Sequence, residues 1–162
     1  MKPHKLESNV VDMLHERHQD ELDAFYFYRA ASNWCKNVGF FKAAEFFAAE
    51  SEDELAHAKK IENYLVDWNI TPQLSEIPKA KVEFKSLVDV IDNAYKIEYE
   101  LYEAYEQTSK EMFKIDLCTF ALTQELLAIQ NKSVAEYSDK LNILEGVEPT
   151  KINLLLIEKN LF

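Results

Sequence analysis

Apolar residues recur along the chain at alternating steps of three and four, which is the spacing of one face of an α-helix. The chain has only two glycines and four prolines, and all of them fall where a helix is expected to end or has not yet begun. We expect Asn9 and Asp116 to cap the first and fourth helices, and Gly39 to end the first. The predicted helices span about 9–37, 40–68, 85–113 and 116–146.

The connections between these helices predict how they are arranged. The second helix follows the first directly after Gly39, so the two should form an antiparallel hairpin. Residues 69–84 lack helical periodicity and contain two prolines. Sixteen extended residues reach about 50 Å, whereas a helix of about 28 residues is about 42 Å long, so this stretch can cross the full length of a bundle. The apolar stretch 152–162 predicts a short fifth helix that needs a partner surface.

These elements predict an all-α chain that forms one domain over residues 1–162. The expected architecture is a four-helix bundle with a long crossover between the second and third helices and a short fifth helix at the C-terminus. Acidic residues outnumber basic ones by 29 to 18, giving a net charge of −11. Such a charge disfavours binding to nucleic acid or to an anionic membrane, and it suits cations.

Two further features bear on where the protein is found. No stretch of the chain approaches a membrane span, and the N-terminus lacks the apolar segment of a signal peptide. Cys35 and Cys118 lie far apart and provide neither a disulfide framework nor a metal-binding spacing. We therefore expect a cytoplasmic protein.

Each predicted bundle helix carries a polar residue near the midpoint of its apolar row. These residues are Glu21, Glu54, Glu98 and Gln130. Because the midpoints of four packed helices lie at one depth, we expect these side chains to meet inside the bundle. His57 follows Glu54 by three residues, so both project from one face of their helix. Buried carboxylates repel one another unless cations lie between them, and this ligand set suits a pair of iron, manganese or zinc ions.

Alternatives stay open for the third helix, for Gln130 and for Tyr28, a further residue near the predicted centre. Glu100 replaces Glu98 as the inward residue if the register of the third helix is shifted by two. Gln130 is either a metal ligand or a polar core residue that hydrogen bonds. Tyr28 lies one heptad after Glu21, where it could pack, hydrogen bond to a ligand or donate an electron.

The chain resembles the ferritins over nearly its whole length, and most closely the bacterial non-haem type. The resemblance rests on an ordered series of motifs: Glu21-Leu22 with Tyr28, Asn33-Trp34-Cys35, Gly39-Phe40, Glu54-Leu55-Ala56-His57, Tyr95-Lys96-Ile97-Glu98, Asp139-Lys140-Leu141 and Leu155-Leu156-Ile157-Glu158-Lys159. It implies a ferroxidase with a di-iron centre, in which dioxygen or peroxide oxidises Fe(II). It also implies a homo-oligomeric hollow shell, a 24-mer, that stores the Fe(III) mineral.

The same resemblance assigns the iron ligands. The residues that match Glu21, Glu54 and His57 bind one iron, and Glu54 bridges to a second iron held by Glu98 and by the fourth helix. The fourth helix has no second Glu-x-x-His, unlike that of bacterioferritins and rubrerythrins. No haem is expected, because the second helix contains no methionine.

The fourth helix departs from the pattern of bacterial non-haem ferritins, which often carry several glutamates at its middle. The corresponding stretch here reads Leu126-Leu127-Ala128-Ile129-Gln130-Asn131. A neutral amide, from Gln130 or from Asn131 if the alignment shifts by one, therefore replaces a carboxylate. We expect a normal first iron site, a weaker second site and little or no third site. Two alternatives stay open: a storage or structural subunit with an impaired ferroxidase centre, and a di-iron peroxidase that stores nothing.

Overall fold

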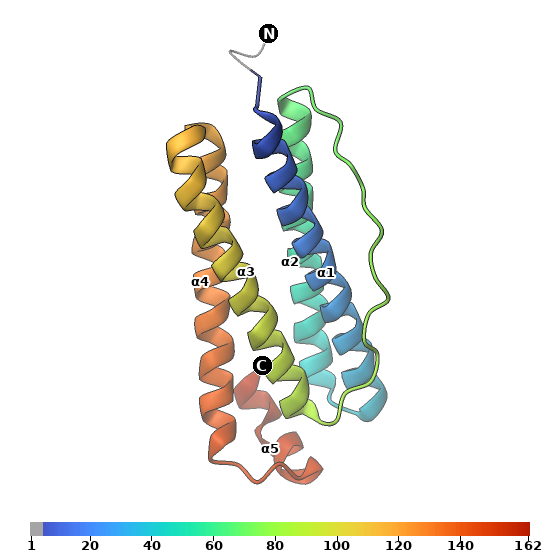
Figure 1. Cartoon of the computed structure of the whole chain (residues 1–162). Helices are drawn as coiled ribbons and strands as arrows, with labels where there is room; N and C mark the ends of the chain where they lie inside the picture. Colours follow the sequence, from blue (N-terminus) through green and yellow to red (C-terminus); the bar gives the residue numbers. More distant parts are fainter. Residues whose placement is uncertain (1–4) are drawn as a thin grey trace.

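The computed structural model describes residues 5–162 and contains helices only within that range. The five helices are α1 Ser8–Val38, α2 Phe41–Asp67, α3 Leu87–Ile115, α4 Leu117–Glu145 and α5 Lys151–Leu161. Figure 1 shows α1 to α4 running side by side, with α5 folded across one end of the bundle. The predicted all-α bundle with a long crossover and a short fifth helix is confirmed.

Two of the predicted helix ends are confirmed by their backbone geometry. Gly39 has a φ of 94°, a left-handed conformation that side chains with a Cβ rarely adopt, and it ends α1. The Asp116 carboxylate accepts a hydrogen bond from the backbone N–H of Thr119 at 2.7 Å, so it caps α4 as expected.

The predicted cap of α1 is wrong. Helix α1 begins at Ser8, and Glu7 occupies the N-cap position without a side-chain hydrogen bond. The Glu7 carbonyl accepts hydrogen bonds from the backbone N–H groups of Val10 and Val11, both at 3.1 Å. The backbone alone therefore starts the helix earlier, and Asn9 lies inside its first turn.

The crossover between α2 and α3 runs back along the bundle beside α1 (Figure 1). Two hydrogen bonds tie it to that helix. The backbone N–H of Gln73 donates to His15 Nε2 at 3.1 Å, and the Gln19 amide donates to the carbonyl of Glu76 at 3.4 Å. His15 therefore has a structural role in fixing the crossover.

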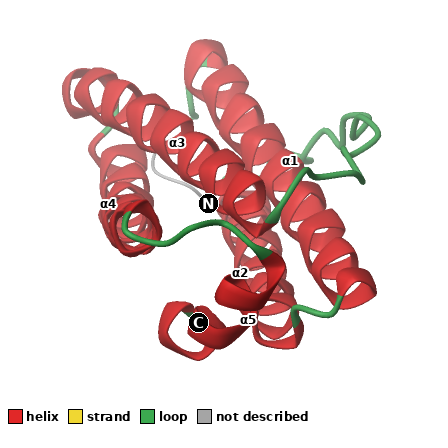
Figure 2. Cartoon of the chain, turned by 90° about the horizontal axis from the view of Figure 1, so that it is seen from below, coloured by secondary structure: helices red, strands yellow, loops and turns green. Residues whose placement is uncertain are grey.

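The bundle consists of two antiparallel hairpins, α1 with α2 and α3 with α4, which are visible end-on in Figure 2. Within the first hairpin, buried His18 on α1 hydrogen bonds to Glu62 on α2 at 2.8 Å, so it too is structural. Tyr28, Tyr105 and Tyr137 are the largest fully buried side chains. These three bulky phenols fill the centre of the bundle, and each hydroxyl requires a buried hydrogen-bond partner there.

Helix α5 is fastened to the bundle by a buried carboxylate. Glu158 Oε1 accepts a hydrogen bond at 2.9 Å from the backbone N–H of Ala43, in the first turn of α2. An anion at a helix N-terminus satisfies an otherwise unpaired N–H and complements the helix dipole. Burial, with a smaller contribution from the Glu158 charge, raises the pKa of nearby Cys35 to about 12. The Cys35 thiol is therefore protonated and inert near neutral pH.

Replacing Glu158 with alanine is expected to lower the free energy of unfolding by about 1.5–3 kcal/mol, because a buried hydrogen bond to a charged group is lost. Urea unfolding of the metal-free protein would measure this. The matched control is Asn160→Ala, because Asn160 is an exposed residue of the same helix. Equal stabilities of the two variants would contradict the role assigned to Glu158.

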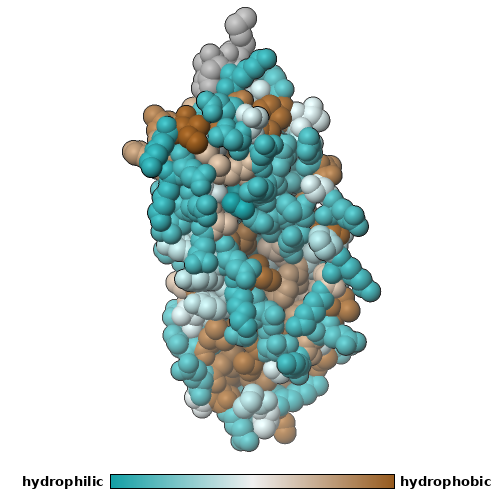
Figure 3. Space-filling model, viewed as in Figure 1, coloured by the Kyte–Doolittle hydropathy of each residue, from teal (hydrophilic) through white to brown (hydrophobic). Residues whose placement is uncertain are grey.

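The face of the molecule drawn in Figure 3 is mostly hydrophilic, and the hydrophobic side chains on it gather mainly toward the two ends of the bundle. At the α3–α4 turn, Phe113, Ile115 and Leu117 are exposed. On α5, Ile152 and Leu156 are exposed. None of the helices in the described part of the chain has an apolar stretch long enough to cross a lipid bilayer.

Candidate metal centre

The predicted ligands come from the middles of all four bundle helices. Glu21 lies on α1, Glu54 on α2, Glu98 on α3 and Gln130 on α4, and all four side chains are buried. They occupy these positions because each belongs to the apolar row that faces the bundle centre. His57, one turn after Glu54, is half-buried. The polar residues therefore lie within the core, as the apolar rows predicted.

Three of these residues converge closely enough to bind one ion. Ligand atoms of Glu21, Glu54 and His57 all lie within 4.8 Å of one another. His57 Nδ1 is 2.9 Å from Glu54 Oε2 and 3.5 Å from Glu21 Oε2. Ligand atoms that surround one transition metal at about 2.0–2.2 Å are themselves about 3–4 Å apart, so this spacing fits a single cation.

Two tyrosines orient the carboxylates. The Tyr105 hydroxyl donates to Glu21 Oε1, and the Tyr28 hydroxyl donates to Glu98 Oε1. Of the other oxygens of these carboxylates, Glu98 Oε2 is buried and has no hydrogen-bond partner, whereas Glu21 Oε2 is buried and faces His57 Nδ1 at 3.5 Å. An anionic oxygen that is buried and unpaired carries a large desolvation cost, and a bound cation would remove that cost.

Burial and mutual repulsion favour the protonated carboxyl groups. Burial raises the pKa of Glu54 well above its ordinary value, and the charges of Glu21 and Glu98 raise it further. Burial also raises the pKa of Glu98 to about 7, although its hydrogen bond from Tyr28 opposes the change. For His57, burial lowers the pKa, but the hydrogen bond and charge of Glu21 outweigh this and raise it overall. The cluster thus holds protons that a cation can displace.

The remaining predicted residues are placed as follows. Glu98 is fully buried, whereas Glu100 is exposed, so the alternative register of the third helix is excluded. Gln130 is buried with its Oε1 unpaired, whereas Asn131 is exposed, so only Gln130 is available to the centre. The cluster that fits a single ion within the described chain includes neither Glu98 nor Gln130.

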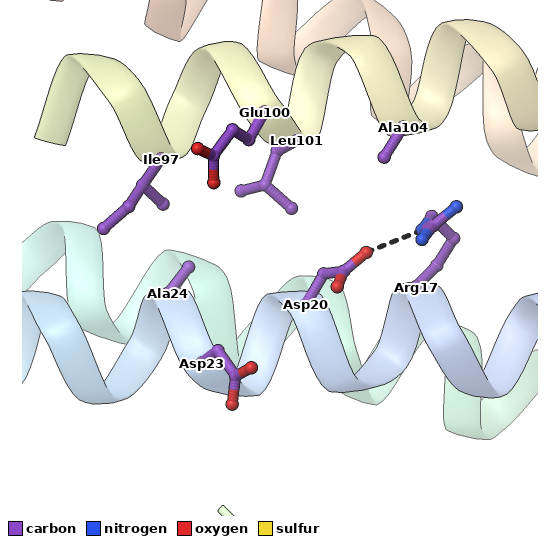
Figure 4. Close-up of a pocket in the computed structure, with 8 residues that line it drawn as sticks. All are labelled: Arg17, Asp20, Asp23, Ala24, Ile97, Glu100, Leu101 and Ala104. Atoms are coloured by element: carbon purple, nitrogen blue, oxygen red, sulfur yellow. Dashed lines mark hydrogen bonds and ion pairs between the residues drawn. The ribbon is translucent and has the colours of Figure 1, made fainter. Parts of the chain in front are cut away.

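Glu100 instead faces a groove between α1 and α3, of about 310 Å³. Figure 4 shows this groove, which Asp20 and Asp23 of α1 and Glu100 of α3 line, with Asp20 pointing toward Arg17 and the Asp23 carboxylate turned away from α3. The Arg17 guanidinium donates to Asp20 at 2.8 Å. None of the residues that line this groove belongs to the buried cluster.

Sequence reasoning missed a second carboxylate on α2. Glu50, one turn before Glu54, is half-buried, and its Oε2 accepts a hydrogen bond from the Tyr137 hydroxyl of α4 at 2.9 Å. Burial raises the pKa of Glu50. The four-residue spacing from Glu54 was the available signal, since it places both side chains on neighbouring parts of one face. Tyr105 was also missed as a site residue, because burial of a tyrosine in a helix row indicates a core position and does not reveal the partner of its hydroxyl.

Comparison with known proteins identifies the class that this fold and site define. The ferritin-like domain family matches residues 11–147. The chain therefore belongs to the ferritin family, and the resemblance seen in its motifs is confirmed.

The similarity to individual relatives covers most of the chain. The chain is 28% identical over 143 residues to the bacterial non-heme ferritin of Campylobacter jejuni, covering 86% of each protein. It is 27% identical over 157 residues to a probable bacterial non-heme ferritin-like protein of Haemophilus influenzae, covering 96% of this chain and 95% of the relative. An open pore ferritin of Archaeoglobus fulgidus has the same fold, with a TM-score of 0.90, 18% identity and 96% coverage of both chains.

Proposed function

We propose that the protein is an iron-storage ferritin whose bundle centre oxidises Fe(II) with dioxygen or peroxide. The observation that supports this most is the convergence of Glu21, Glu54 and His57 within 4.8 Å inside the bundle. Iron is the substrate and the cargo of this reaction. Carboxylates and one imidazole are suitable ligands for Fe(II), and their negative charge favours the more highly charged Fe(III) product.

In the proposed mechanism, Glu21, Glu54 and His57 bind the first Fe(II). Glu54 bridges to a second Fe(II), which Glu98 binds through its unpaired oxygen. Two Fe(II) ions supply two electrons, which with two protons reduce dioxygen to hydrogen peroxide or peroxide to two waters. The carboxyl protons released when the metal binds are available at the site. Tyr28 holds Glu98 in position through its hydrogen bond.

The second iron site is expected to be the weaker one, because Gln130 is neutral where a carboxylate would add charge. Replacing Gln130 with glutamate is predicted to tighten binding of the second metal about tenfold, since an anionic ligand would face the ion from α4. Anaerobic calorimetric titration with Fe(II) measures this step separately from the first. The control is Asn131→Glu, because Asn131 is exposed on the same helix. An effect as large in the control would assign the change to general surface charge.

The experiment that tests the function is anaerobic Fe(II) titration, followed by admission of air and by a crystal structure of the iron-soaked protein. We expect two ions per chain bridged by Glu54 and rapid formation of Fe(III). Oxidation no faster than in buffer would instead identify a storage or structural subunit with an impaired centre, the alternative that the neutral Gln130 favours. Rapid oxidation without mineral after repeated additions of iron would identify a non-storing di-iron peroxidase.

We further propose a homo-oligomeric shell of 24 subunits in a reducing cytoplasm. The exposed apolar residues at the α3–α4 turn and on α5 support contact between subunits, since such residues favour burial. Both cysteines are free thiols, as expected in a reducing compartment. Light scattering of the purified protein would give the assembled mass.

A further inference from the structure

Two buried tyrosines connect Glu98, a proposed iron ligand, to Glu50, a carboxylate of the site that is not a proposed iron ligand. The Tyr28 hydroxyl donates to Glu98 Oε1. The Tyr28 ring lies parallel to the Tyr137 ring, with centroids 6.2 Å apart and an interplanar angle of 15°. The Tyr137 hydroxyl then donates to Glu50 Oε2 at 2.9 Å. Both rings are 0% exposed, so the connection from Glu98 to Glu50 passes through the protein interior.

This arrangement provides what the oxidation of a tyrosine requires. A neutral phenol that loses an electron becomes strongly acidic, so its proton must pass to a base within hydrogen-bond reach. Burial raises the pKa of Tyr28 and of Tyr137 well above ordinary values, so both phenols are neutral before any reaction. The base available to Tyr137 is Glu50, which is half-buried and can exchange protons with solvent.

The bases of the two tyrosines differ in one important respect. The partner of Tyr28 is Glu98, the proposed ligand of the second iron, so a proton left there opposes the binding of a second Fe(II). Glu50 binds no iron in the proposed mechanism, so a proton on Glu50 does not interfere with metal binding. Reduction of oxidised Tyr28 by Tyr137 is therefore favourable, because the proton of Tyr137 passes to Glu50 and not to a proposed iron ligand.

We propose that Tyr137 is a second redox-active tyrosine, which supplies an electron to the iron site through Tyr28 while its proton passes to Glu50. The inference rests on the proposed ferroxidase function. It applies when peroxide meets a centre that holds only one Fe(II), a condition that a weak second site favours. Peroxide must then find its second electron in the protein.

The step balances as follows. Hydrogen peroxide takes two electrons and two solvent protons and gives two waters. Fe(II) supplies one electron and becomes Fe(III). Tyr28 supplies the other electron and passes its proton to Glu98. When Tyr137 reduces Tyr28, Tyr28 takes an electron from Tyr137 and regains its proton from Glu98. The net change in the protein is that the O–H bond of Tyr137 breaks, an O–H bond forms on Glu50, and a neutral radical remains on Tyr137.

The test uses the assembled protein loaded anaerobically with one Fe(II) per chain and mixed with hydrogen peroxide. Freeze-quenched samples are examined for a tyrosyl radical by electron paramagnetic resonance, and iron oxidation is followed by absorbance in parallel. The variants are Tyr137→Phe, Glu50→Gln and Tyr28→Phe. The control is Tyr64→Phe, because Tyr64 also hydrogen bonds between α2 and α4, to Thr119, but lies outside the site. Melting curves of the metal-free variants verify that each is folded.

We expect the long-lived radical of the wild type to be lost in Tyr137→Phe, strongly reduced in Glu50→Gln, and unchanged in Tyr64→Phe. Iron oxidation itself should continue in Tyr137→Phe. An undiminished radical in folded Tyr137→Phe, or no radical in a wild type that oxidises iron, would overturn the inference and leave the proposed function standing. An undiminished radical in Glu50→Gln would overturn the role of Glu50 as base. A wild type that oxidises no iron would overturn both proposals.

Discussion

Replacing Glu54 with glutamine is expected to slow Fe(II) oxidation by about 100-fold or more. Removing a group that merely supports a metal ligand costs about 10–100-fold, and Glu54 is proposed to contact both ions directly. The same change should make the metal-free protein more stable. Burial, and after it the charges of Glu21 and Glu98, raises the pKa of Glu54, and a neutral amide avoids the cost of burying an ionisable group among like charges. Stopped-flow absorbance after mixing with Fe(II) in air and urea unfolding of the apoprotein would measure the two effects.

The matched control is Glu52→Gln on the same helix. Glu52 is exposed and forms only a surface ion pair with Arg29 at 3.3 Å, so neither oxidation nor stability should change appreciably. A Glu54→Gln protein that oxidises iron at the wild-type rate would remove Glu54 from the proposed centre. A less stable apoprotein would show that the carboxyl group is structural.

The metal-free protein is expected to lose stability as the pH rises from about 5 to about 8. Glu98 has a pKa of about 7 in the folded protein, against an ordinary value of 4.5. Between these values the unfolded chain has released a proton that the folded chain retains, so raising the pH favours unfolding. At about 1.4 kcal/mol per unit, Glu98 alone accounts for a loss on the order of 3 kcal/mol. The raised pKa of His57 acts in the same direction, because its stabilising contribution disappears as the imidazolium deprotonates.

Divalent metal should reverse this dependence, because the cation replaces the protons and binds most tightly once they are gone. Urea unfolding over this pH range, with and without Zn²⁺ as a redox-inactive probe, would measure both profiles. Glu98→Gln provides the control, since its metal-free profile should be flatter. A stability that is constant or that rises with pH in the metal-free wild type would contradict the buried, protonated state assigned to the carboxyl groups.

Much of the fold could be predicted because each feature depends on local sequence or on length. Gly39 ends a helix through its own φ, and the crossover is long enough to span the bundle. The inward row of the third helix favoured Glu98 but left Glu100 open, and burial in the structure decided for Glu98. The prediction that Asn9 caps α1 was wrong, because α1 begins at Ser8 and no side chain caps it.

The part of the site that could not be predicted consists of hydrogen bonds between side chains on different helices. Glu50 and Tyr137 belong to α2 and α4, and their hydrogen bond depends on how each helix is rotated about its axis. Tyr105 lies in an inward row, but the row does not show that its hydroxyl meets Glu21 on α1. A periodic pattern gives the face of one helix, whereas the partner of a buried hydroxyl is set by packing between helices.

The division of the bundle into two hairpins has a consequence for assembly of the metal centre during folding. Glu21, Glu54 and His57 all belong to the α1–α2 hairpin, whereas Glu98 and Gln130 belong to the α3–α4 hairpin. Contacts within each hairpin are close in sequence and are expected to form early, but docking of one hairpin on the other must close the long crossover. The proposed first iron site is therefore encoded within one folding unit. The proposed second site would form only after the two units dock, so its occupancy would report completed folding of the chain.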